Sequence, residues 1–270
     1  VMATAIDERS PYTGGHIRRV AEMTMVVAQA VNDCAEGTLA NVHFDGDEME
    51  ELRIAAWMHD IGKITTPEWI VDKPTKLTTI YDRIETLRLR FALMQQQVER
   101  LQERSQIDSQ EAQQRLEKLA SDLAFLERAN LPGEYMEDAD VERLRDIAQQ
   151  TYELQGQAHP CITDEELMNL VIRKGSLTEA ERKKINDHAS MSIKMLEQIP
   201  FTRKLRRVPE IAGAHHEKLD GSGYPNGLKA ESIDLQSRIL ALVDIFESLS
   251  ADDRPYRAKP MPREMVLKIL

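Results

Sequence analysis

Hydrophobic residues along this chain recur at spacings of three and four, whereas the alternation that marks a β-strand is hard to find. Such a period is typical of amphipathic helices. The first apolar face follows Ser10-Pro11, a pair that suits a helix start. A second helix is predicted from a capping box at Asp47 and Glu50 to His59. We therefore expect an all-α protein. The first face consists of His16, Val20, Met23, Val27 and Ala30.

From Thr79 to Ala129 the apolar positions form a heptad seam, with polar residues between them. Ser105 and Asp108 interrupt the seam, which then resumes in a shifted phase. Two interpretations fit, an antiparallel helical hairpin or one long helix with a stutter, and we favour the hairpin. The seam consists of Ile80, Ile84, Leu87, Phe91, Met94, Val98 and Leu101, and then of Leu116, Leu119, Leu123 and Leu126.

A third amphipathic helix is predicted from about Val141 to Leu154, followed by a linker over residues 156–160. Beyond the linker, two capping boxes indicate where further helices begin. They are Thr163 with Glu166, and Thr178 with Glu181.

Composition and charge narrow the function. The 270 residues carry a net charge of −11, which argues against a binder of nucleic-acid polymers or of membrane surfaces. Cys34 and Cys161 show neither disulfide nor zinc-type spacing, which fits a reducing compartment. No apolar run approaches the length of a membrane span. We expect a cytoplasmic protein without direct membrane insertion, cut at both ends from a longer chain such as a sensor with this output domain.

Five of the seven histidines fall on core-facing helix positions or at helix ends, and two aspartates accompany them. One buried histidine that binds a backbone carbonyl is common, whereas five spread over several helices indicate a site. Imidazoles and carboxylates without cysteine suit Fe, Mn or Zn. Seven ligands suit two divalent ions that share a carboxylate. The candidate ligands are His16, His59, Asp60, His188, His215, His216 and Asp244.

A glycine-rich stretch follows the paired histidines. Pro209 can begin a short helix that ends at His215-His216, and the next residues include Gly221, Gly223 and Pro225. Glycine permits positive φ, so this backbone can pass close to a ligand. Histidines at a helix end beside such a loop predict a metal site with a substrate-binding lip.

Together these motifs resemble the HD-GYP family of cyclic-dinucleotide phosphodiesterases, within the HD phosphohydrolase superfamily. The resemblance covers roughly residues 1–78 and 166–270, and the family fold is an all-α HD bundle. The segment 79–165 has no counterpart in a compact family member, so we expect an inserted helical hairpin or coiled coil there. The matching motifs are Thr13-Gly14-x-His16, the HDxGK stretch from His59 to Lys63, His188, the HHExxDGxGYP pattern from His215 to Pro225, and Asp244 with Asp253-Arg254-Pro255-Tyr256.

The resemblance implies a role for each residue. His16, His59, Asp60 and Asp244 would hold one ion, and Asp60 would bridge to a second ion held by His188, His215 and His216. Fe or Mn is expected, with Zn and Ni as alternatives. Asp60 and Lys63 would serve catalysis, with Lys63 on the scissile phosphate. Gly223, Tyr224, Pro225 and Arg254 would line the nucleotide pocket.

Three functions compete at this point. The first is a phosphodiesterase that opens a cyclic dinucleotide to the linear form with a metal-activated water. Cyclic di-GMP is the expected substrate, and cyclic GMP-AMP is the alternative. The second is a catalytically weak cyclic-dinucleotide receptor that signals through its insertion. The third, an HD hydrolase of other nucleotides, is disfavoured by the Gly-Tyr-Pro loop. We expect segment 79–165 to support a homodimer, because its apolar stripe must be covered.

Tyr12 stands where many family members have a glutamate that helps to hold a third metal. A neutral phenol is a poor ligand for a divalent ion at neutral pH. We therefore expect two ions per chain, and a linear dinucleotide as the main product.

Overall fold

The computed structural model describes residues 15–133, 135–252 and 260–270. It divides the chain into two compact units. The first, which we call the histidine unit, comprises Val1–Asp72 and Glu181–Leu270. The second, which we call the hairpin unit, comprises Lys73–Ala180 and interrupts the first in sequence. Its bounds differ by several residues from the 79–165 segment expected from the sequence.

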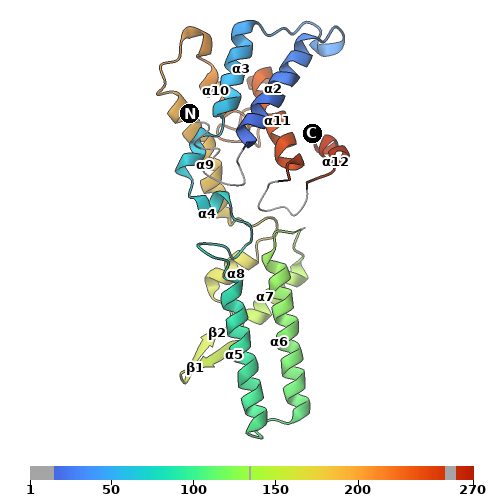
Figure 1. Cartoon of the computed structure of the whole chain (residues 1–270), viewed down its shortest axis with the longest axis vertical. Helices are drawn as coiled ribbons and strands as arrows, with labels where there is room; N and C mark the ends of the chain where they lie inside the picture. Colours follow the sequence, from blue (N-terminus) through green and yellow to red (C-terminus); the bar gives the residue numbers. More distant parts are fainter. Residues whose placement is uncertain (1–14, 134, 253–259) are drawn as a thin grey trace. The chain divides into compact units, whose positions relative to one another are not determined.

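The histidine unit is built from helices joined by short loops and 3₁₀ turns (Figure 1). Its longer helices are α2 (His16–Asn32), α3 (Gly46–Met58), α9 (Glu179–Leu196) and α11 (Leu235–Ser250). Three shorter ones are α4 (Glu68–Val71), α10 (Val208–Gly213) and α12 (Arg263–Ile269). Four 3₁₀ turns connect them, η1 (Gly37–Leu39), η2 (Ile61–Thr65), η3 (Arg203–Leu205) and η4 (Ala230–Ser232).

The core of this unit is aliphatic, as the low aromatic content predicts. Helix α2 packs against α3 and α11, and α10 packs against the same two helices. Leu52, Ala55 and Ala56 of α3 are fully buried in a cluster with Leu240 of α11. Small alanine side chains let the helices approach closely, so the residues at the helix ends are held firmly.

The start of α3 differs from its prediction by two residues. The capping box is formed by Asp45 and Glu48 rather than by Asp47 and Glu50. Asp45 accepts from the backbone N–H groups of Asp47 and Glu48, and Glu48 accepts from the N–H of Asp45. Both pairs have the same spacing, and Asp45 prevails because it directly precedes the helix in extended backbone.

The hairpin unit confirms the predicted helical hairpin. Helix α5 (Ile84–Glu103) and helix α6 (Ser109–Asn130) run side by side (Figure 1). The turn between them contains Ser105 at a φ of 54°, and Asp108 caps α6 by accepting from the N–H of Glu111. Arg88 near the start of α5 binds Glu127 near the end of α6, so the two helices are antiparallel.

The heptad seam forms the core of this unit. Ile84, Leu87, Phe91, Met94 and Val98 are buried against α6 and its neighbours. Ile80 does not belong to the seam, since it precedes α5 and is 98% exposed. The stripe that motivated an expected dimer is therefore covered within the unit itself.

The expected helix from Val141 to Leu154 is wrong in its second half. Helix α7 ends earlier (Asp138–Ala148), and a two-stranded antiparallel sheet follows, β1 (Thr151–Leu154) and β2 (Gln157–Pro160). Its two-residue turn has positive φ at both Gln155 and Gly156, the combination that suits a tight hairpin. Helix α8 (Asp164–Leu170) then begins with the predicted capping box of Thr163 and Glu166.

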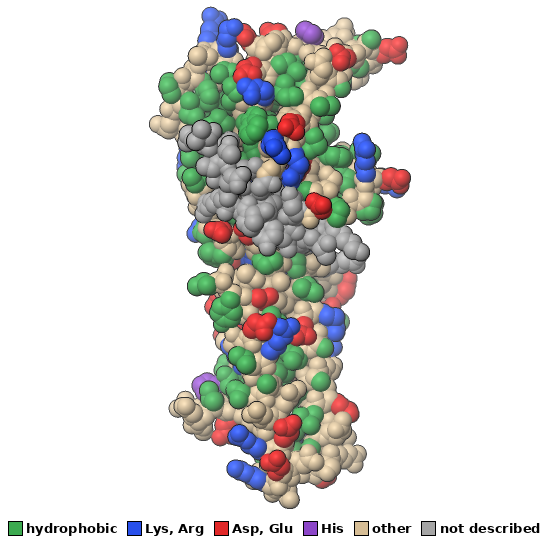
Figure 2. All heavy atoms as spheres, in the orientation of Figure 1, with side chains coloured by type: hydrophobic (Ala, Val, Ile, Leu, Met, Phe, Trp, Pro, Cys, Tyr) green, Lys and Arg blue, Asp and Glu red, His purple; other side chains and the backbone are tan. Residues whose placement is uncertain are grey.

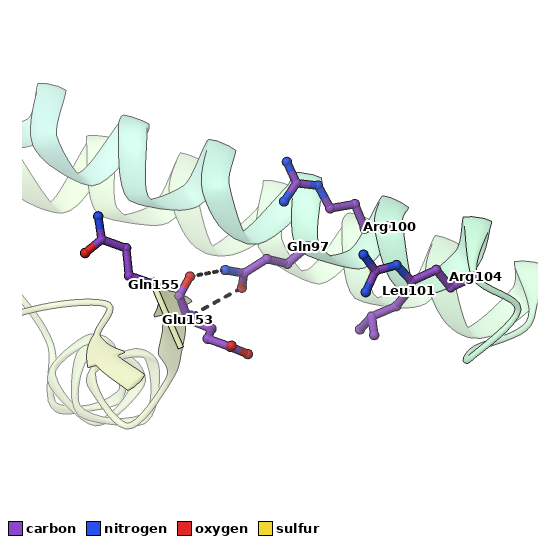
Figure 3. A pocket seen from close by; sticks show the side chains of 6 residues that line it. All are labelled: Gln97, Arg100, Leu101, Arg104, Glu153 and Gln155. Atoms are coloured by element: carbon purple, nitrogen blue, oxygen red, sulfur yellow. Dashed lines mark hydrogen bonds between the residues drawn. The ribbon is translucent and has the colours of Figure 1, made fainter. Parts of the chain in front are cut away.

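The β-hairpin is fastened to α5 through one amide side chain. Gln97 donates to the carbonyl oxygen of Glu153 and accepts from the N–H of the same residue at 3.4 Å (Figure 3). Beside this contact lies an open cavity of about 340 Å³, whose lining includes Arg100 and Arg104. The edge of β1 is thus satisfied by a side chain instead of a third strand.

The all-α prediction is confirmed, since this small sheet is the exception among the described residues. None of the described helices combines the length and the apolar character that a membrane crossing requires.

Candidate metal centre

Five helices of the histidine unit bring the predicted ligands together. His16 is the first residue of α2, His59 and Asp60 directly follow α3, and His188 lies within α9. The His215-His216 pair follows α10 after one intervening residue, Ala214, and Asp244 lies within α11. Three groups of side chains offer ligand atoms within 4.8 Å of one another: His16 with His59 and Asp60, His188 with His215 and His216, and His59 with His215 and Asp244.

The carboxylate of Asp60 lies between two sets of imidazoles. Its Oδ2 is 3.4 Å from Nε2 of His59 and 3.6 Å from Nε2 of His16. Its Oδ1 is 3.3 Å from Nε2 of His188 and 4.0 Å from Nε2 of His215. Each oxygen therefore faces a different set.

Asp244 closes the first set. Its Oδ1 is 3.3 Å from Nε2 of His16 and 3.7 Å from Nε2 of His59. The second set is closed by His216, whose ring centroid lies 4.0 Å from that of His215 and 5.0 Å from that of His188. All seven predicted ligands are thus near one another.

Backbone carbonyls fix the orientation of three of these imidazoles. Nδ1 of His59, His188 and His215 each contacts the carbonyl oxygen three residues earlier, at 2.8, 2.5 and 2.5 Å. A carbonyl only accepts, so each Nδ1 must carry the proton. The Nε2 atoms are left with a lone pair, and that lone pair is what a metal requires.

Four buried polar atoms at this point lack a hydrogen-bond partner in the described part of the chain: Nε2 of His59, His188 and His215, and Oδ1 of Asp60. Such atoms are costly unless something binds them. Ligand atoms at about 2.0–2.2 Å from one ion lie about 3–3.5 Å apart, close to the spacing of Asp60 from His16, His59 and His188. The donor set and its unsatisfied atoms therefore fit divalent metal.

The charges of the cluster support the same reading. Burial alone would raise the pKa of Asp60, but the positive charge of Lys63 beside it holds that pKa well below its usual range. Burial, with a smaller contribution from the neighbouring imidazoles, lowers the pKa of His215 well below its usual value and that of His216 to about 4. Asp60 is thus an anion and the paired histidines are neutral, which are the forms that ligate metal.

Lys63 lies at the edge of the cluster. Its Nζ donates to Oδ2 of Asp60 at 2.5 Å, and its side chain is 22% exposed. The ammonium group therefore reaches both the carboxylate of Asp60 and the solvent side of the site.

Gly62 explains how the turn after His59 meets α9. A Cβ at Gly62 would lie 2.0 Å from the carbonyl oxygen of His188, so no larger residue fits there. Ser192, one turn after His188, accepts from the N–H of Gly62 and donates to the carbonyl oxygen of His59. The sequence suggests a helix stop at Gly62, whereas in the structure the glycine permits close packing.

The glycine-rich loop is held by a buried carboxylate. Glu217 accepts from the backbone N–H groups of Asn226 and Leu228, at 2.7 and 2.8 Å. Gly223 passes so close to residue 217 that a Cβ would lie 2.5 Å from its Cα. The ring of Tyr224 consequently lies 4.7 Å from that of His216, next to the second set of ligands.

Arg254 and Tyr12 lie outside the described residues, so their predicted roles are unchanged. His43 and His159 belong to none of the three ligand groups, and His159 stacks on Tyr152 in the β-hairpin. Sequence reasoning missed the contacts of Ser192 and of Glu247, a buried acid near His16. For Glu247 a signal existed, since it follows Asp244 by three residues on an apolar helix.

Comparison with known proteins agrees with this site. Two family models, both described as an HD domain, match residues 13–144 and 161–270. A 3'3'-cGAMP-specific phosphodiesterase of Vibrio cholerae is 44% identical over 103 residues, which cover 38% of this chain and 21% of the relative. A cyclic di-GMP phosphodiesterase response regulator of Xanthomonas campestris is 37% identical over 89 residues, or 33% and 23% of the two chains.

A cyclic di-GMP phosphodiesterase of Thermotoga maritima is 35% identical over 95 residues, which cover 35% of this chain and 25% of the relative. The matched region thus spans about a quarter or less of each of these three relatives.

Proposed function

Because this chain belongs to the HD domain superfamily and carries the motifs of its HD-GYP family, we propose that it hydrolyses a cyclic dinucleotide to the linear dinucleotide. The observation that carries the proposal is the position of Asp60, whose two oxygens face two separate sets of imidazoles. The relatives named above are described as phosphodiesterases of cyclic GMP-AMP or of cyclic di-GMP. Cyclic di-GMP is the first substrate proposed here, and cyclic GMP-AMP is the second.

Two divalent ions would be held by the two sets. His16, His59 and Asp244 would bind the first ion, His188, His215 and His216 would bind the second, and Asp60 would bind both. When bound, such ions activate water and neutralise charge on a phosphodiester. Fe or Mn suits this mixture of imidazole and carboxylate, with Zn and Ni as alternatives.

The chain's own residues would bind and orient the substrate. Lys63 would turn its ammonium group from Asp60 to the scissile phosphate, where it stabilises the negative charge of the transition state. Tyr224 and its neighbours in the loop, Gly223 and Pro225, would line one side of the nucleotide pocket. Arg254 is proposed as a further contact with the substrate.

The test is to incubate the purified protein with Mn²⁺ or Fe²⁺ and with each cyclic dinucleotide, and to identify the products by mass. We expect a linear dinucleotide, with slow or absent formation of mononucleotide. Metal analysis should give two ions per chain, as the tyrosine at position 12 predicts. A bound and unchanged cyclic dinucleotide would instead support the receptor function.

The hairpin unit is proposed to mediate a homodimer. Leu89 and Leu93 lie one turn apart on α5 and are 69% and 37% exposed, so an apolar strip remains on this helix. Figure 2 shows hydrophobic side chains among charged ones of both signs on the face of this unit in view. Light scattering should give the mass of a dimer for the wild type and of a monomer for Leu89→Glu with Leu93→Glu. A monomer in both forms would contradict the proposal.

A further inference from the structure

His16 is oriented differently from three other imidazoles of the centre. His59, His188 and His215 contact a backbone carbonyl three residues earlier, and each of those carbonyls belongs to a helix. His16 is the first residue of α2, so no carbonyl of its own helix precedes it. A contact of its Nδ1 comes instead from another helix, α11.

Glu247 of α11 supplies that contact. Its Oε2 accepts from Nδ1 of His16 at 2.6 Å, although 231 residues separate the two in sequence. The carboxylate is 2% exposed, so water does not compete for it. A carboxylate that accepts from Nδ1 fixes the ring and leaves Nε2 pointing at Asp60 and Asp244.

The carboxylate is itself held in place. Arg19, one turn after His16 on α2, donates from Nε to Oε1 of Glu247 at 2.7 Å, and its Nη2 forms an ion pair with the same oxygen at 2.6 Å. Both contacts of Arg19 are made to Oε1, whereas Oε2 contacts His16. The charged guanidinium thus holds the carboxylate while its other oxygen binds the imidazole. Asp244 precedes Glu247 by three residues, so one face of α11 presents both a direct ligand and the support of another ligand.

We propose that Glu247 is a positioning residue that orients His16 for the first ion. The proposal rests on the proposed metal-dependent function. Glu247 acts through His16 and touches neither substrate nor metal. It takes the place of the backbone carbonyls that orient His59, His188 and His215. Its loss should weaken the binding of one ion and leave the binding of the other unchanged.

The test compares Glu247→Gln with Glu51→Gln in Zn²⁺-loaded protein. Glu51 is a matched control, since it is buried in the same unit and accepts from the N–H of Arg207, away from the metal centre. Competition with a chelator gives the two dissociation constants. For Glu247→Gln we expect one of the two dissociation constants to rise at least about tenfold, because loss of a contact that supports a metal ligand generally weakens metal binding by that much. Both should stay within about threefold in Glu51→Gln.

A spectroscopic readout separates orientation from folding. In protein labelled with ¹⁵N-histidine, the Nδ1–H signal of His16 should shift in Glu247→Gln while the signals of His59, His188 and His215 remain. If Glu247→Gln does not fold, Arg19→Gln replaces it, because the Arg19 side chain is 37% exposed. This variant should raise the dissociation constant of the same ion by a smaller factor.

The outcomes distinguish the inference from the proposed function. Wild-type protein that binds no divalent ion contradicts the metal-dependent function itself. If the wild type binds two ions but the dissociation constants are unchanged in Glu247→Gln, or both rise equally, the role of Glu247 is overturned. The metal-dependent function is then unaffected. If only Arg19→Gln folds, unchanged constants in that variant overturn it.

Discussion

The two units bury polar groups in opposite ways. In the hairpin unit several buried polar side chains have partners within the unit: Lys73 donates to Asn169, Lys76 donates to the carbonyl oxygen of Leu170, and Asp122 binds Lys118. In the histidine unit, three imidazole nitrogens and one carboxylate oxygen converge without a hydrogen-bond partner among the described residues.

The buried polar groups of the two units therefore have different roles. A buried polar group with a partner stabilises one conformation, whereas a cluster without partners costs free energy unless a ligand binds it. The hairpin unit therefore uses its buried charges to hold its own helices together. The histidine unit places its unsatisfied groups where a bound ligand would stabilise them.

The largest expected effect on activity comes from removing a ligand of the metal centre. Removing a buried carboxylate of the hairpin unit provides the comparison. Asp60→Asn, Asp60→Ala or His59→Ala should lower hydrolysis by about 1,000-fold or more, because metal contributes several kcal/mol to such reactions. The helical circular dichroism should persist. Asp122→Asn should keep full activity and lower the free energy of unfolding by about 1–3 kcal/mol. Wild-type turnover and metal content in Asp60→Asn would contradict the metal assignment.

Metal binding should stabilise only the histidine unit. At a free Mn²⁺ concentration about 100 times the dissociation constant, binding adds about 2.7 kcal/mol to the state that holds the ion. Hydrogen exchange measured by mass spectrometry should therefore slow in α2, α3, α9 and α11 when metal is added to chelated protein. The segments of α5 and α6 should exchange as before. Equal slowing of hydrogen exchange in both units would contradict the idea that metal stabilises only the histidine unit.

A smaller effect concerns Lys76 in the hairpin unit. Burial lowers its pKa to about 8, and the charge of Asp140 only partly opposes this. Between about pH 8 and pH 10.5 the unfolded lysine holds a proton that the folded one has lost, so raising the pH favours folding. We expect wild-type protein to gain about 1–3 kcal/mol over this range relative to Lys76→Met. Parallel denaturation curves of the two proteins would show this idea to be wrong.

Much of the centre could be predicted because the sequence pattern around each ligand shows where it lies on or beside a helix. His16, His188 and Asp244 lie on helical faces with a clear period, and the pairs at residues 59–60 and 215–216 follow helices whose ends are recognisable. The assignment of each residue to one ion stays a prediction. The helical hairpin was predictable because its seam is long, whereas Ile80 was misplaced because a period alone does not fix where a helix begins.

What the sequence could not reveal depends on contacts between distant segments. The roles of Gly62 and Ser192 arise from α9 lying against the turn after α3, some 130 residues away. The spacing of Glu247 from Asp244 places the two on one helix face, but the contact of Glu247 with His16 depends on α2 lying beside α11. The β-hairpin was missed because Gln155 adopts a positive φ, for which its residue type gives no signal.

The contact between Ser192 and His59 also has a consequence for the folding pathway. It joins residues 133 apart, and forming such a loop from an unfolded chain is entropically unfavourable. Ser176 donates to the carbonyl oxygen of Lys73, so a folded hairpin unit already closes 103 of those residues. About 30 flexible residues then remain, which lowers the loop-closure cost by ~1 kcal/mol. Folding of the hairpin unit first would thus speed assembly of the histidines around Asp60.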